Sequence, residues 1–177
     1  RKGHDKIVDV LIKNKANINH ASTNGYTALI SASMNGHDKI VDLLIKNKAN
    51  INHASNKGRT ALISASYSGK SVHVIETLIE KKADLFKQLT RYDRKTQGKV
   101  GDTALDLAQK TLEKMKNDNQ NTSNLIKIIE LLVNADPDEI NELHFYKAKQ
   151  DTEMIDQCVT LNAMMQYEYD RYGSSQF

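Results

Sequence analysis

The sequence predicts an all-α fold, an α-solenoid in which short helical units stack side by side. Residues 3–33 and 36–66 are copies of one another at an offset of 33 residues, and 27 of the 31 aligned positions are identical. The apolar residues of the second copy recur at the spacing of one helical stripe, namely Ile40, Val41, Leu44 and Ile45. Because a unit of this size cannot bury its stripe alone, the copies must stack on one another.

The amino-acid composition limits the classes of protein to which this chain can belong. The chain has 177 residues, of which 39% are hydrophobic and 27% charged, as is typical of a globular protein. No apolar run approaches the roughly 18 residues of a membrane span, and no signal-peptide pattern follows the first residues. Cys158 is the single cysteine, so no internal disulfide can form, which favours a reducing compartment. We expect a cytoplasmic protein that does not insert into membranes.

Glycine, aspartate and turn-forming residue pairs predict where the helices begin and end within each copy. Gly36 ends a short helix, because glycine tolerates the positive φ of that position. Asp38 begins the next helix, where its charge suits the helix dipole. An Asn-Gly pair at 24–25 and a Lys-Gly pair at 57–58 are turn signals. Each unit is therefore expected to be a turn followed by two short helices.

Two further copies follow in altered form. Residues 60–85 form the third copy, and the fourth is divided between 101–109 and 125–136. Insertions at 87–100 and 110–124 interrupt it. The first insertion lengthens a turn, and the second extends a helix and ends in a polar loop.

The two ends of the array differ. The chain opens just before a second-helix pattern, so we expect the first unit to be partial and an upstream repeat or cap to cover its apolar residues. The run Asp-Pro-Asp-Glu at 136–139 is a helix start with Pro at its first position. It predicts a helix over 137–149 and a second helix after Asp151. Residues 137–177 are therefore predicted to be a C-terminal helical capping extension.

Three short motifs recur with the period. They are Thr-Ala-Leu at 27–29, 60–62 and 103–105, Gly-His at 3–4 and 36–37, and Ala-Asn-Ile-Asn at 49–52. This period and these motifs resemble the ankyrin repeat, a β-turn and two helices repeated about every 33 residues. The resemblance covers about three quarters of the chain and implies about four repeats, the first partial, within residues 1–136. The family's Thr-Pro-Leu-His becomes Thr-Ala-Leu-Ile at 27–30, and the lost histidine predicts a stack less stable than consensus arrays.

Candidate catalytic and metal-binding residues are few. His20 and His53 recur with the repeat and so have a structural explanation, and no His or Cys spacing matches a zinc site. The Gly-Lys-Ser run at 69–71 lacks the upstream glycine of a phosphate-binding loop. A thiol nucleophile at Cys158 with His144 as its base has no orienting Asn or Asp that the sequence can place. We therefore expect no catalysis, no cofactor and no metal.

The differences between copies indicate a binding surface. Three of the four substitutions between the near-identical copies surround the turn glycine, at 23/56, 24/57 and 26/59. The end of the first helix also differs between successive units, at 34/67 and 35/68. The resemblance implies that these positions face the concave groove of the array, where ankyrin-repeat proteins bind partners. The predicted partner-binding residues of this set are Thr23, Asn24, Tyr26, Met34, Asn35, Asn56, Lys57, Arg59, Tyr67 and Ser68.

The insertion at 87–100 adds a basic loop. It carries five Lys or Arg residues against a single acidic residue, Asp93. We expect Arg91, Tyr92, Arg94 and Lys95 to contact an acidic patch on the partner. One basic loop and a net charge of +3 are weak indications of nucleic-acid binding.

The sequence therefore predicts a non-enzymatic module that binds a protein partner through the concave groove and the turn tips. Neutral drift of exposed turn residues is the competing explanation of the variation, but Tyr and Arg are the types favoured in interfaces. The alternatives are a substrate-recruiting arm of a larger enzyme, a structural spacer, or an effector that an intracellular bacterium secretes into a host cell. The 51 Lys, Asn and Ile residues and the near-identical repeats resemble those of ankyrin proteins of intracellular bacteria, amoebae or their large viruses, some of which act inside a host cell. A secreted effector of this kind would act in the host-cell cytoplasm.

Overall fold

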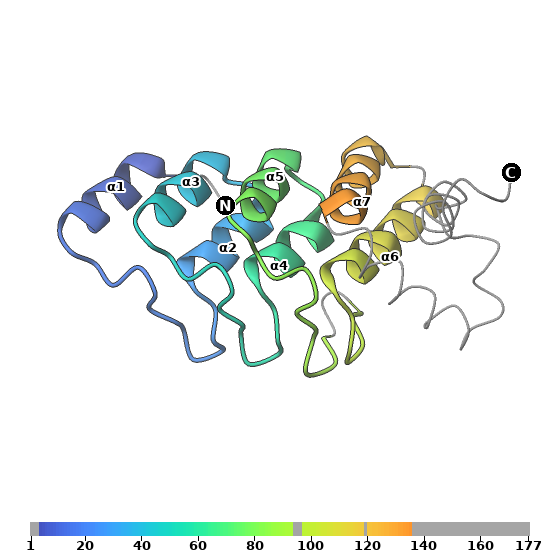
Figure 1. Cartoon of the computed structure of the whole chain (residues 1–177), viewed down its shortest axis with the longest axis horizontal. Coiled ribbons are helices and arrows are strands. Elements are labelled where there is room, and N and C mark those ends of the chain that lie inside the picture. The colour runs from blue at the N-terminus through green and yellow to red at the C-terminus, as the bar shows by residue number, and fades with distance from the viewer. Residues whose placement is uncertain (1–3, 94–96, 119, 136–177) are drawn as a thin grey trace, which may run out of the picture. The chain divides into compact units, whose positions relative to one another are not determined.

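The structure is a computed structural model, which describes residues 4–93, 97–118 and 120–135 (Figure 1). The chain divides into two compact units, Arg1–Leu132 and Val133–Phe177. The described part of the chain contains seven α-helices and no strand: α1 (Asp5–Lys13), α2 (Ala28–Asn35), α3 (Asp38–Lys46), α4 (Ala61–Ser68), α5 (Val72–Glu80), α6 (Ala104–Asn117) and α7 (Ser123–Ala135). The predicted all-α solenoid is confirmed.

Helices of the first unit form two layers. The first helices of the units, α2, α4 and α6, pack side by side in one layer, and α1, α3 and α5 pack side by side in the other. Within a unit the layers are joined, because α2 packs on α3 and α4 on α5. The turns between units project from one edge of the stack as long tips, below the helices in Figure 1.

The first-layer helices begin at threonine caps, and α2 ends at Gly36 as the sequence predicts. The hydroxyl oxygens of Thr27, Thr60 and Thr103 accept hydrogen bonds from the backbone three residues on, at 3.2–3.3 Å, and so cap the helix N-termini. Gly36 and Gly69 end α2 and α4 in the left-handed conformation. Gly69 is also required for packing, because an added Cβ would lie 2.8 Å from the Leu125 side chain of α7.

The core lies between the two layers. Its largest fully buried apolar residues are Leu29, Ile30, Leu62, Ile63, Ile75, Leu78, Leu89, Leu107, Leu125, Ile128 and Ile129. Three residues of the predicted stripe of α3, Ile40, Val41 and Leu44, are buried, and Ile45 is half-buried. In α1, which nearly repeats the sequence of α3, Ile7 and Leu11 are more than half exposed. The stripe is therefore buried only where a neighbouring helix covers it.

The interrupted fourth copy also folds into two helices. The second insertion extends α6 to Asn117, with Leu112 buried, and α7 begins at Ser123, two residues before the predicted start. The predicted helices after residue 136, together with His144 and Cys158, lie outside the described residues.

Candidate functional site

Successive tips contact each other through the backbone. The Asn56 N–H donates to the Asn24 carbonyl at 3.2 Å, and one unit later the Thr90 N–H donates to the Lys57 carbonyl at 3.0 Å. Gly58 has φ +80°, and a Cβ there would lie 2.5 Å from the Gln88 carbonyl oxygen. The tip therefore needs glycine both for its backbone conformation and to admit the next tip.

The basic loop is an enlargement of one tip. In the regular tip the Ser55 N–H donates to the Arg59 carbonyl, and in the enlarged tip the Leu89 N–H donates to the Asp102 carbonyl. The two residues are four apart in the first case and thirteen in the second, so the extra residues lie between 90 and 101. We call residues 90–101 the finger. Its base is fixed by buried Leu89 and by the Asp102 carboxylate, which accepts bonds of 2.6 Å from the Lys99 N–H and Lys110 Nζ.

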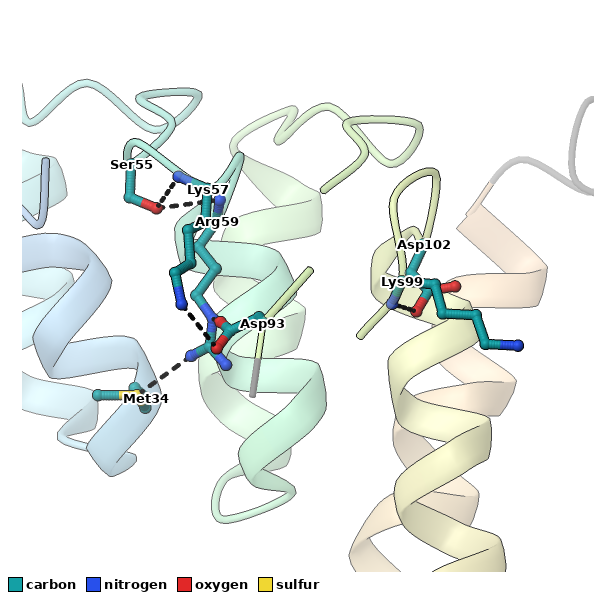
Figure 2. A network of polar contacts seen from close by, with 7 residues as sticks. All are labelled: Met34, Ser55, Lys57, Arg59, Asp93, Lys99 and Asp102. Carbon is teal, nitrogen blue, oxygen red and sulfur yellow. Dashed lines mark hydrogen bonds and ion pairs between the residues drawn. The ribbon is translucent and has the colours of Figure 1, made fainter. Parts of the chain in front are cut away.

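The finger is joined to the preceding tip by a buried ion pair. Arg59 Nε lies 2.5 Å from Asp93 Oδ2, and each side chain is only 1% exposed (Figure 2). Lys57 Nζ lies 3.4 Å from Asp93 Oδ1 and is 43% exposed. Asp93 is positioned within the finger by the hydrogen bond from its N–H to the Gly98 carbonyl. The acidic residue of the basic loop thus points inward, onto two cations of the neighbouring tip.

The Arg59 guanidinium also contacts two residues of the first-layer helices. Its Cζ lies 5.5 Å from the centre of the Tyr67 ring, within range of a cation–π interaction. Its Nη1 lies 3.6 Å from the sulfur of Met34, on α2. Four predicted binding residues therefore form one cluster with Asp93: Met34 and Tyr67 contact Arg59, and Arg59 and Lys57 pair with Asp93.

This cluster covers one face of α4. Ser31 of α2, Ser64 of α4 and Leu107 of α6 each lie four residues after the capping threonine. Ser31 is exposed, whereas Ser64 and Leu107 are fully buried. Tyr67 follows Ser64 by three residues, so helical spacing puts these two residues on one face of α4, where Arg59 lies over the Tyr67 ring. Arg59, which the sequence analysis places among the partner-binding residues, is itself buried, and its guanidinium is paired with the Asp93 carboxylate of the finger.

The other predicted residues remain accessible to different degrees. Thr23, Asn24, Asn56, Arg91 and Tyr92 are exposed, whereas Tyr26, Met34, Asn35, Lys57, Tyr67 and Ser68 are half-buried. Three of them also bond backbone carbonyls: Asn56 Nδ2 bonds Thr23, Asn35 Nδ2 bonds Ser31 and Ser68 Oγ bonds Ala65. Arg94 and Lys95 lie outside the described residues.

Asp93 is the residue that the sequence analysis did not select. A signal was present, since Asp93 is the single acidic residue of an otherwise basic loop. A second signal lies in the preceding tip. There Lys57 and Arg59 replace the uncharged Asn24 and Tyr26 of the preceding copy, so the tip gains two cations. A lone acid and two new cations in adjacent tips together predict a contact between the tips.

The repeated histidines have a structural role where their contacts are known. His53 Nε2 lies 3.0 Å from the Gly25 carbonyl oxygen and so joins one tip to the preceding one. Among the residues that the structure describes, no group of three or more His, Cys, Asp or Glu side chains could hold a metal ion. None of the helices within that part of the chain is long and apolar enough to cross a membrane.

Comparison with known proteins identifies the repeat. A family model of ankyrin repeats, in three copies, matches residues 1–88. No curated protein matches the sequence.

Proposed function

Because the chain is an ankyrin-repeat protein, we propose that it binds a protein partner through the tips and the ends of the first-layer helices. Ankyrin repeats generally mediate protein–protein interaction and are typically non-enzymatic. We define the variable face as the ten predicted residues of the tips and helix ends: Thr23, Asn24, Tyr26, Met34, Asn35, Asn56, Lys57, Arg59, Tyr67 and Ser68. This face corresponds to the concave groove of the family.

One observation carries the proposal. Two copies of the repeat keep 27 of 31 positions identical, yet three of their four differences lie at the tips. Tyr26 is half-buried and Asn24 is exposed, so a partner that covers Tyr26 would bury the remaining apolar area of its ring. A constant scaffold with a varied face favours partner recognition.

The finger supplies charge for the same interaction. Arg91 and Tyr92 are exposed on it, and Asp93 is turned inward onto Arg59. The outward charge of the finger is therefore positive, and we propose that it meets an acidic patch on the partner together with Arg94 and Lys95. Such contacts mainly raise the rate of association.

The proposed location is the cytoplasm, which the single cysteine supports. A substrate-recruiting arm of an enzyme or an effector in a host cell would use the same face. The identity of the captured partner decides between these roles.

Affinity capture from cytosolic lysate tests the proposal. The full chain is compared with a Tyr26→Ala, Asn35→Ala variant and with a control variant, Lys39→Ala, Lys46→Ala, whose exposed side chains lie on α3 of the other layer. We expect the wild type and the control to capture the same protein and the first variant to lose it. Capture of that protein by all three would contradict binding through the variable face.

A further inference from the structure

The guanidinium of Arg59 is buried but poorly satisfied. Its Nε approaches Asp93 Oδ2 closely, although the two groups are not aligned as a hydrogen bond. Its Nη1 contacts only a thioether sulfur, a weak acceptor. Its Nη2 has no hydrogen-bond partner among the described residues. Since buried polar groups are nearly always hydrogen-bonded, this is an unusual state for a cation with five donors.

The unsatisfied atoms share one edge of the guanidinium. Nε–H and Nη2–H point the same way, and a carboxylate that faces this edge can accept both in a bidentate pair. Asp93 Oδ2 approaches this edge at Nε, and among the described residues Nη2 has no hydrogen-bond partner there. A carboxylate free to align itself would therefore satisfy Arg59 better than the one that the finger provides.

We propose that Arg59, with Tyr67 and Lys57 beside it, is a binding site for the carboxylate of an acidic side chain, and that Asp93 fills it as an internal substitute. The site itself follows from the contacts above, and only the source of the ligand, an acidic peptide segment of the partner, rests on the proposed function. The partner's Asp or Glu takes the place of Asp93 at the Nε–Nη2 edge.

The exchange of one carboxylate for another avoids leaving the buried Arg59 guanidinium without a counter-charge. Removing Asp93 alone would leave the cation uncompensated in a dry environment, which is strongly unfavourable. Replacing one carboxylate by another keeps Arg59 paired throughout. The base of the finger does not depend on Asp93, because Leu89 and Thr90 are held by backbone bonds to Asp102 and Lys57.

The site is particular to one repeat. Arg59 stands where the preceding copy has Tyr26, and Lys57 stands where it has Asn24. Two of the four differences between the copies thus introduce the two cations that face Asp93. Lys57 Nζ is partly exposed at the edge of the site, where it can attract an incoming anion before Asp93 leaves.

Titration of the full-chain Asp93→Ala variant with sodium acetate tests the site. Sodium chloride holds the ionic strength constant. The reporter is the ¹³C-methyl resonance of Met34, whose sulfur contacts the guanidinium, assigned with a Met34→Leu variant. We expect a saturable shift toward the wild-type position, with no such shift in the wild type or in Asp93→Ala, Arg59→Gln. A shift that persists without Arg59, or no saturable shift in folded Asp93→Ala, would overturn the proposal.

A second titration tests the exchange and remains possible if Asp93→Ala does not fold. Hexaglutamate is added to the wild type and to Asp93→Asn, which preserves the shape of the side chain, with hexaglutamine as the neutral control. We expect Asp93→Asn to bind hexaglutamate about tenfold more tightly than the wild type, because the internal competitor is lost. Equal affinities for the two proteins would contradict the exchange. If the wild type captures no partner although Asp93→Ala binds acetate as expected, the result contradicts the proposed function and leaves the carboxylate site standing.

Discussion

Asp93 pairs with Arg59 across one full repeat, with both side chains almost completely buried. The contact fixes the orientation of the finger, because it draws the single acid of a basic segment onto the preceding tip. It also removes Arg59 from the surface, whereas the other nine residues of the variable face are exposed or half-buried. The ion pair thereby separates Arg59 from the accessible residues of the variable face.

Removing Asp93 and removing Lys57 should differ greatly in their effect on stability. We expect Asp93→Ala to lower the free energy of unfolding by about 3–5 kcal/mol, because it leaves Arg59 buried and unpaired. Lys57→Ala should cost less than about 1 kcal/mol, since Lys57 Nζ is partly exposed and 3.4 Å from the carboxylate. Urea unfolding of both variants checks this, and similar costs would show that burial does not govern the pairing.

Gly58 should be less tolerant of substitution than another glycine of positive φ. A Cβ at Gly58 would lie 2.5 Å from the Gln88 carbonyl, whereas a Cβ at Gly101 would meet nothing within 4 Å. We expect Gly101→Ala to cost about 1 kcal/mol from backbone strain alone. Gly58→Ala should cost at least about 1 kcal/mol more, because the finger base must also shift. Thermal unfolding of the pair decides, and equal losses would exclude close packing as the reason for Gly58.

Asparagine side chains should join the repeats through their oxygens. Asn19 Oδ1 accepts from the Asn50 N–H at 2.7 Å, and Asn52 Oδ1 accepts from the Asp84 N–H at 2.8 Å, one repeat later. We expect Asn52→Ala to destabilise the array by about 1 kcal/mol. Asn52→Asp keeps the acceptor oxygens and serves as the matched variant in urea unfolding. If Asp restores nothing, the acceptor is not the source of the effect.

Partner association should depend on salt through the finger. Arg91 is exposed there, and we expect Arg91→Glu to slow association about tenfold at low ionic strength. The difference from wild type should shrink as salt rises, because exposed charges are screened over about 8 Å at physiological ionic strength. Surface plasmon resonance with the captured partner measures both rates. An effect confined to dissociation would argue that Arg91 makes a buried contact instead of steering.

Much of the fold could be predicted because it is local and repeated. Thr27 and Thr60 cap their helices and Gly36 ends α2 through bonds within a few residues, and the sequence repeats these signals. The stripe of α3 is buried because an almost identical helix precedes it. The start of α7 differed from the prediction by two residues.

The state of Arg59 could not be predicted in the same way. Arg59 stands at a tip position whose counterpart, Tyr26, is half-buried, and nothing near it in sequence explains its burial. Asp93, which pairs with Arg59, lies in an insertion that the other copies lack. The repeat therefore does not predict which residue of the finger contacts Arg59. The inward turn of Asp93 depends on contacts one repeat away.

A double-mutant cycle between Arg59 and Asp93 tests the central claim most directly. Arg59→Met, Asp93→Leu and the double variant are compared with the wild type by urea unfolding, because the apolar replacements remove the charges and keep much of the volume. The account predicts a coupling free energy of about 3 kcal/mol, with the double variant more stable than either single variant. A coupling of zero within error would contradict the buried ion pair that holds the finger to the array.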